Sequence, residues 1–187
     1  MTQPVEASPS SLPVGPAEVA RLATIGVYGF TSEQFIETLR RAGIGLVLDV
    51  RQRRGVRGSE YAWANSLRLQ NLLRGAGIAY EHHRELAPTT ELRQLQYRED
   101  KRLGVGKRSR THLASAYVEG YCDEILSQVD LRELAAHLRC ERPAALMCVE
   151  REPESCHRSL VAARLGEILE QAPVHLLPAE ARPWPES

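Results

Sequence analysis

The sequence has few cysteines, no net charge and no long apolar run, and each absence excludes a class of protein. Four cysteines in 187 residues are far fewer than a small disulfide-stapled secreted scaffold contains. No apolar run approaches the roughly 20 residues that a membrane-spanning helix needs, and no signal peptide is visible at the N-terminus. We therefore expect a cytoplasmic protein with reduced thiols and no membrane association.

Charge is balanced overall but unevenly distributed. With 24 basic and 24 acidic residues, the chain has no overall field that would attract nucleic acid or a membrane surface. Residues 51–110, however, include fourteen Lys and Arg residues but only six Asp and Glu residues. This local excess predicts an anionic partner, either a small anionic substrate or nucleic acid. The alternative is that these side chains are simply the solvated faces of helices.

The length fits one domain flanked by irregular ends. Residues 1–18 are rich in proline and serine and poor in large apolar groups, so they are predicted to be a disordered leader. Residues 19–178 are predicted to form a single α/β domain, and residues 179–187 a proline-rich tail. No oligomeric state can be predicted.

Apolar runs alternate with helical patterns along the domain. Strands are expected at residues 22–28, 44–50, 78–80, 144–149 and 174–177. Helices are expected at about 32–42, 65–76, 91–98, 111–128, 130–138 and 156–169, with a mobile loop over 104–106. This alternation predicts a three-layer, Rossmann-like parallel sheet with helices on both faces. Ligands bind beyond the carboxyl ends of the strands in such sheets, which selects the loops after Asp49 and after Cys148.

The first of these loops begins with Asp49-Val50-Arg51. A buried carboxylate at a strand end is costly unless it is paired, and Arg51 lies two residues on, on the same side of an extended chain. Arg51 and Arg57 are therefore candidate anion-binding residues, and Asp49 is a candidate catalytic carboxylate. The alternative is an internal Asp–Arg pair that holds the loop in place.

The second loop runs from Cys148 through Glu150 to Cys156-His157-Arg158. Cys156 and His157 open a helix, where the backbone N–H groups and the helix dipole favour anions and lower a thiol pKa. We expect Cys156 and His157 to take part in, or to shape, the reacting centre, with His157 as a general base or proton donor and Arg158 as an anion-binding group. Asp49 or Glu150 would be the acid–base or nucleophilic carboxylate. The alternative is a structural role for Cys156 and His157. Cys148 closes an apolar strand and is more typical of a buried core thiol.

A metal or other cofactor is not predicted. Cys148, Glu150, Cys156 and His157 include sulfur, oxygen and nitrogen donors, so a metal stays a minor alternative. Their spacing nevertheless matches no recognised structural zinc pattern. The Gly104-Val-Gly-Lys107 stretch lacks the first half of a phosphate-binding P-loop.

With these residues in view, the chain resembles the bacterial family catalogued as domain of unknown function 488. Four segments carry the resemblance, and together they span roughly residues 22–170: Thr24-Ile-Gly26, Asp49-Val-Arg51, Gly77-Ile-Ala-Tyr80 and Met147-Cys148-Val-Glu150 with Cys156-His157-Arg158. The last segment is the most specific, because a C-x-E followed by C-H-R at this spacing is rare by chance. The resemblance implies an α/β fold and assigns no reaction.

Three hypotheses for function follow. The first is an enzyme, a hydrolase or transferase, that acts on a phosphate-bearing substrate such as a nucleotide, a nucleoside derivative or nucleic acid. The second is a non-catalytic nucleic-acid-binding module with Tyr61, Trp63 and Tyr97 as stacking groups. Its basic contacts would be Arg53, Arg54, Lys107, Arg108 and Arg110. The third is a thiol or metal redox protein built on Cys148 and Cys156.

Overall fold

The computed structural model describes residues 22–106, 109–140 and 142–178. The predicted leader and tail, residues 1–18 and 179–187, lie outside the described residues, as do Lys107 and Arg108. Within the described ranges, no helix is long and apolar enough to cross a membrane.

A five-stranded parallel sheet forms the centre of the domain. Its strands are β1 (Leu22–Gly26), β2 (Leu46–Asp49), β3 (Ala79–His82), β4 (Ala144–Cys148) and β5 (Val174–Leu176), arranged in the order β3-β2-β4-β1-β5. Every pair is parallel, and β4 lies between β2 and β1. In register, Asp49 lies opposite Met147 and Gly26 lies opposite Cys148. The ends of β2 and β4 therefore meet at one edge of the sheet.

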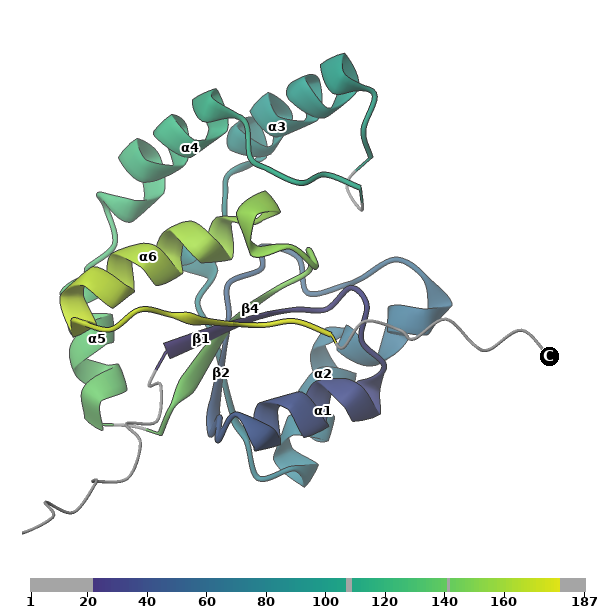
Figure 1. The fold of residues 1–187 in the computed structure, drawn as a ribbon, viewed down its shortest axis with the longest axis vertical. Helices are drawn as coiled ribbons and strands as arrows, with labels where there is room; N and C mark the ends of the chain where they lie inside the picture. Colours follow the sequence, from purple (N-terminus) through teal and green to yellow (C-terminus); the bar gives the residue numbers. More distant parts are fainter. Residues whose placement is uncertain (1–21, 107–108, 141, 179–187) are drawn as a thin grey trace, which may run out of the picture.

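Helices cover both faces of this sheet and confirm the predicted three-layer fold (Figure 1). On one face, α1 (Ser32–Arg41) and α2 (Ser66–Gly75) bury their apolar sides against the strands. On the other face lie α5 (Leu131–Cys140) and α6 (His157–Leu169). The same core is extended by α3 (Thr90–Leu103) and α4 (Ser115–Tyr121), which lie side by side beyond α6 in Figure 1.

Local sequence explains most of these boundaries. In α1, the side chain of Thr31 accepts a hydrogen bond from the backbone of Gln34, whose own side chain accepts from the Thr31 backbone. This capping box satisfies two N–H groups that the helix would otherwise leave unpaired. Phe35 and Leu39 then fall on one buried face.

Several elements differ from the sequence-based expectation. The first strand ends at Gly26 rather than residue 28, and residues 59–64 form a 3-10 helix where none was expected. Helix α3 continues to Leu103, past the expected end at residue 98. The sequence did not indicate this extension because polar side chains, Gln96 and Asp100, are buried on the inward face, so that no apolar period is visible there. The helix expected from residue 111 begins at Ser115, and its second half is a π-helical segment, Cys122–Leu126.

The strand order creates a crevice at the ends of β2 and β4. The chain leaves β2 toward the α1–α2 face and leaves β4 toward the α5–α6 face. Adjacent parallel strands whose connections diverge to opposite faces leave a gap between them, and this topological switch point is where ligands bind in open α/β sheets. Both loops singled out from the sequence flank this gap.

Candidate functional site

A cavity of about 490 Å³ opens at this switch point. The loop after β2, helix α3, the segment leading into α4, and the turn between β4 and α6 all contribute to its wall. Five arginines and a single carboxylate, Glu150, are among its lining residues. These arginines are Arg51, Arg53, Arg57, Arg93 and Arg110. The cavity therefore brings residues from both predicted loops into one strongly basic site.

Asp49 and Arg51 form a buried ion pair beside this cavity. The Arg51 guanidinium donates to both carboxylate oxygens of Asp49, through Nε at 2.8 Å and Nη2 at 2.7 Å, and its backbone N–H donates to Oδ1 at 3.1 Å. A third guanidinium bond goes to the carbonyl of Ala64 at 3.0 Å. Asp49 is fully buried and does not line the cavity. This arrangement matches the alternative stated for the sequence, an internal pair that holds the loop.

Tyr80 completes the surroundings of this pair. Its hydroxyl donates to Asp49 Oδ2 at 2.7 Å. Burial raises the pKa of Tyr80 to about 12, and the Asp49 carboxylate acts in the same direction against the opposing effect of Arg54. Arg54 thus lies toward Tyr80 and is not among the residues that line the cavity.

Cys148 and Glu150 lie at the end of β4, on the floor of the cavity. The Cys148 thiol lies 3.3 Å from Glu150 Oε2, and both side chains are buried yet contribute to the cavity lining. The loop that carries Glu150 passes very close to the end of β1. A Cβ on Gly26 would lie 1.9 Å from the Glu150 carbonyl oxygen, so only glycine fits at that position.

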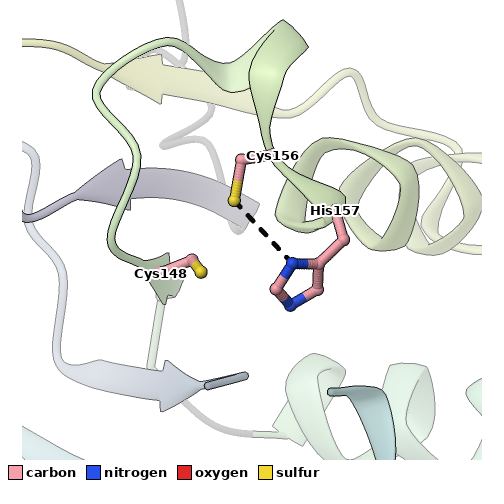
Figure 2. A group of neighbouring side chains, drawn as sticks. All are labelled: Cys148, Cys156 and His157. Carbon is pink, nitrogen blue, oxygen red and sulfur yellow. Dashed lines mark hydrogen bonds between the residues drawn. The ribbon is translucent and has the colours of Figure 1, made fainter. Parts of the chain in front are cut away.

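Cys156 and His157 enter the same space from the start of α6. Figure 2 shows both side chains pointing toward Cys148, with 3.9 Å between Cys156 Sγ and His157 Nδ1. His157 Nε2 lies 3.0 Å from the carbonyl oxygen of Val50. Because a carbonyl can only accept, Nε2 carries a hydrogen, and the neutral ring presents the Nδ1 lone pair to the thiol. The loop after β2 thereby fixes the orientation of an imidazole on α6.

Protonation of this pair is strongly perturbed. Burial acts to raise the pKa of Cys156, but contact with Cys148 and the positive charges of Arg158 and His157 outweigh burial and lower it to about 5. Burial acts to lower the pKa of His157, and the neighbouring Cys156 reverses that effect and raises it. The two directions together favour transfer of the Cys156 proton to the Nδ1 lone pair of His157, which turns the neutral pair into a thiolate and an imidazolium.

Arg158 has a different place from the one expected. Its side chain is fully buried, and it donates to the carbonyl oxygens of Glu150 at 2.7 Å and Arg151 at 2.8 Å. It does not line the cavity. Arg158 therefore ties the turn after β4 to α6 and supplies positive charge beneath Cys156, in place of the direct anion contact predicted from the sequence.

The remaining basic residues divide into two groups. Arg53 and Arg57 are exposed on the loop after β2, and Arg93 is half-buried on α3; all three line the cavity. Arg110 is buried and donates to Asp100 at 2.9 Å. Within the described part of the chain, the buried Nε of Arg110 has no hydrogen-bond partner. The other two predicted basic contacts, Lys107 and Arg108, lie outside the described residues.

Sequence reasoning missed several of the residues that line the cavity. Among them are Arg93 and the aromatic side chains of Tyr28 and Tyr117. Arg93 and Tyr117 belong to the polar α3–α4 region. Because this region shows no clear apolar period, the sequence could not indicate that these two helices pack over the ends of the strands. Extending the ligand rule for open sheets to the loop after β1 would have selected Tyr28.

Three donor atoms at the cavity floor are close enough to share a ligand. The sulfurs of Cys148 and Cys156 and a ring nitrogen of His157 all lie within 4.8 Å of one another. All three side chains are buried. The cluster combines two soft sulfur donors with an imidazole, which together form a set that transition metals bind.

Fold and site together define an α/β domain with a strand-end cavity that is basic on its walls and carries thiols and an imidazole on its floor. The chain belongs to the family described as Domain of unknown function DUF488, whose model matches residues 31–165, well over half of its length. Neither a curated protein nor a solved structure matches the chain.

Proposed function

We propose that this protein is an enzyme that acts on a phosphate-bearing substrate of nucleotide size held in the cavity at the ends of β2 and β4. The observation that carries the proposal is the pairing, in one cavity, of arginines with a cluster of chemically reactive side chains. At about 490 Å³, the volume falls within the usual range for small-molecule sites. A cytoplasmic location remains part of the same proposal.

The arginines supply the binding half of the site. Arg51 and Arg110 are each bonded to a buried carboxylate, whereas Arg53, Arg57 and Arg93 are placed on the walls. Planar guanidinium groups bind phosphate through paired, charge-assisted hydrogen bonds. The buried Nε of Arg110 adds a donor whose missing partner is costly, and a bound anion would satisfy it.

The floor supplies the reacting half of the site. Glu150 and His157 are acid–base groups at the end of the cavity, and the sulfurs of Cys148 and Cys156 are potential nucleophiles or ligands. Tyr28 and Tyr117 on the walls offer aromatic faces on which a base could stack. This combination favours a nucleotide or nucleoside phosphate over inorganic phosphate alone.

The shape of the site disfavours a module that binds duplex nucleic acid. Such a module presents its basic side chains along an open surface, but here Arg110 is buried in an ion pair and Arg54 lies toward Tyr80. The basic residues of the 51–110 stretch that face a ligand do so across a concave cavity. A single-stranded end that inserts one nucleotide would still fit the proposal.

A turnover screen tests the proposal. The full chain is incubated with a panel of nucleoside mono-, di- and triphosphates and short oligonucleotides, and products are detected by mass spectrometry. We expect conversion of at least one phosphate-bearing compound, and we expect Glu150→Gln to lower its rate by about 100-fold or more, the usual contribution of an acid–base group.

The matched control is Glu154→Gln, an exposed carboxylate in the same turn that does not line the cavity. Its rate should equal that of the wild-type protein. Equal rates for the Glu150 and Glu154 variants would remove Glu150 from the reaction. Absence of conversion together with absence of binding to every phosphate-bearing compound would overturn the proposal.

A further inference from the structure

The cluster of Cys148, Cys156 and His157 has a geometry that exceeds what a substrate-binding cavity requires. Two sulfurs and an imidazole nitrogen converge within 4.8 Å, although their residues come from the end of β4 and the start of α6 (Figure 2). We infer that these three side chains bind one zinc-like divalent metal ion at the floor of the cavity. A metal ion at this position goes beyond the proposed function, which does not require one.

Distances within the cluster are close to those of a tetrahedral site. With zinc–sulfur bonds of about 2.3 Å and zinc–nitrogen bonds of about 2.0–2.1 Å, neighbouring ligand atoms are separated by roughly 3.5–3.8 Å. Cys156 Sγ and His157 Nδ1 lie 3.9 Å apart, and the 4.8 Å limit holds for all pairs. Closing the cluster around an ion therefore requires shifts of less than about 1 Å and no movement of the backbone elements.

His157 is oriented as a metal ligand should be. Its Nε2–H donates to the Val50 carbonyl at 3.0 Å, which fixes the ring and turns the Nδ1 lone pair toward the sulfurs. Histidines that bind metals nearly always donate their other N–H to a carbonyl or carboxylate in this way. The bond also connects the loop after β2 to the metal site.

Charge and ligand type favour zinc over the hard cations. Two thiolates balance the two positive charges of the ion, and a neutral imidazole leaves the buried complex without net charge. A neutral complex avoids the large cost of burying an isolated ion. Thiolate and imidazole donors select zinc and related metals, whereas magnesium and calcium prefer oxygen donors.

Three protein ligands leave a fourth position on the cavity side. Glu150, whose Oε2 lies 3.3 Å from Cys148 Sγ, stands beside that position and lines the cavity. Three protein ligands with one open position are typical of catalytic zinc rather than structural zinc. An ion there would supply a Lewis acid for a phosphoryl oxygen at the end of the basic cavity.

Cobalt titration of the full chain tests the inference. The protein is reduced, stripped with a chelator and titrated with Co²⁺ in the absence of any phosphate-bearing ligand. We expect one equivalent to bind, with a sulfur-to-cobalt charge-transfer band in the near ultraviolet, and stoichiometric Zn²⁺ to abolish the band. Because no anionic ligand is present, the outcome is independent of whether the proposed function holds.

Variants assign the ligands. Loss of an outer-shell partner commonly weakens metal binding by about 10–100-fold, so Cys148→Ser, Cys156→Ser and His157→Asn should each weaken it by at least about 100-fold. The matched control is the double variant Cys122→Ser with Cys140→Ser, which removes the two exposed thiols. It should bind cobalt as tightly as the wild-type protein. An unchanged cobalt spectrum in the Cys148 and Cys156 variants would overturn the inference.

A measurement on the wild-type chain guards against variants that do not fold. Zn²⁺ should protect Cys148 and Cys156 from alkylation, as read by mass spectrometry after denaturation, while Cys122 and Cys140 react whether or not zinc is present. If the reduced protein binds neither cobalt nor zinc and Cys148 instead forms a disulfide with Cys156 in air, the metal site is refuted. The pair would then be a redox pair.

Discussion

The Asp49–Arg51 pair gives the most quantitative prediction, because both side chains are buried and their hydrogen bonds give the pair a structural role. Asp49 is fully buried and Arg51 is 2% exposed. Removing the carboxylate by Asp49→Ala leaves the guanidinium buried with one remaining bond, to the carbonyl of Ala64. Breaking a buried pair in this way costs about 3–5 kcal/mol.

Tyr80 adds little to this cost. Its hydroxyl loses an acceptor in the variant, but the side chain is half-buried, so water can replace the carboxylate. We therefore expect Asp49→Ala to lower the free energy of unfolding by about 3–5 kcal/mol, out of the 5–15 kcal/mol usual for a domain. Urea denaturation followed by circular dichroism measures this difference, provided that the slope of the transition is unchanged.

Two comparisons sharpen the experiment. Glu37→Ala breaks an exposed pair with Arg41, in which the Arg41 side chain is 79% and the Glu37 side chain 53% exposed, and should cost no more than about 0.5 kcal/mol. The double variant Asp49→Ala with Arg51→Ala removes both buried charges and should be less destabilised than the sum of the single variants. A cost below about 1 kcal/mol for Asp49→Ala, or strict additivity in the double variant, would refute the structural role.

Two further predictions concern the surroundings of the site. Gly26→Ala should lower the free energy of unfolding by about 3 kcal/mol or more, because the added Cβ would meet the backbone of Glu150. Urea denaturation measures this change, and an unchanged free energy of unfolding would show that the loop can move away. Burial raises the pKa of Glu81, but hydrogen bonds from His83 and His137 outweigh burial and lower it below 4.5. The contribution of Glu81 to the free energy of unfolding should therefore be present above pH 4.5 and be lost as the pH falls through the lowered pKa. The wild-type protein and Glu81→Gln should thus converge in stability at low pH, and a constant difference between them would contradict this assignment.

The fold could be predicted because the apolar runs are long and regular. Val47 and Leu48 belong to a strand that is buried on both faces, and such strands appear in a sequence as continuous apolar runs. Alternation with helices then leaves a parallel sheet as the expected arrangement. The ligand rule for such sheets placed the site at the ends of β2 and β4, where the cavity lies.

Individual roles could not be predicted, because they depend on where side chains point. Asp49 is bonded to Arg51, and Arg158 to backbone carbonyls, inside the protein, and a one-dimensional pattern cannot distinguish that from a position facing a ligand. The convergence of Cys148 with Cys156 and His157 could not be predicted for the same reason. Seven residues separate the two cysteines along the chain, and only the turn between β4 and α6 brings their sulfurs together.

Arg93 offers the most direct test of the central claim, that the basic cavity holds a phosphate group. It lines the cavity from α3, while Arg98 is an exposed arginine on the same helix outside the cavity. A hydrogen bond to a charged group contributes about 1.5–3 kcal/mol, equivalent to about 10–100-fold in affinity. Substituting Arg93 should therefore weaken phosphate binding, whereas substituting Arg98 should not.

The measurement is calorimetric titration of AMP, with adenosine as the ligand that lacks phosphate, into the wild-type protein, Arg93→Ala and Arg98→Ala. We expect the wild-type protein and Arg98→Ala to bind AMP equally and more tightly than adenosine, and Arg93→Ala to lose about 10–100-fold in affinity for AMP with no change for adenosine. Equal affinities for AMP and adenosine, or equal losses in the two arginine variants, would contradict a phosphate site in this cavity.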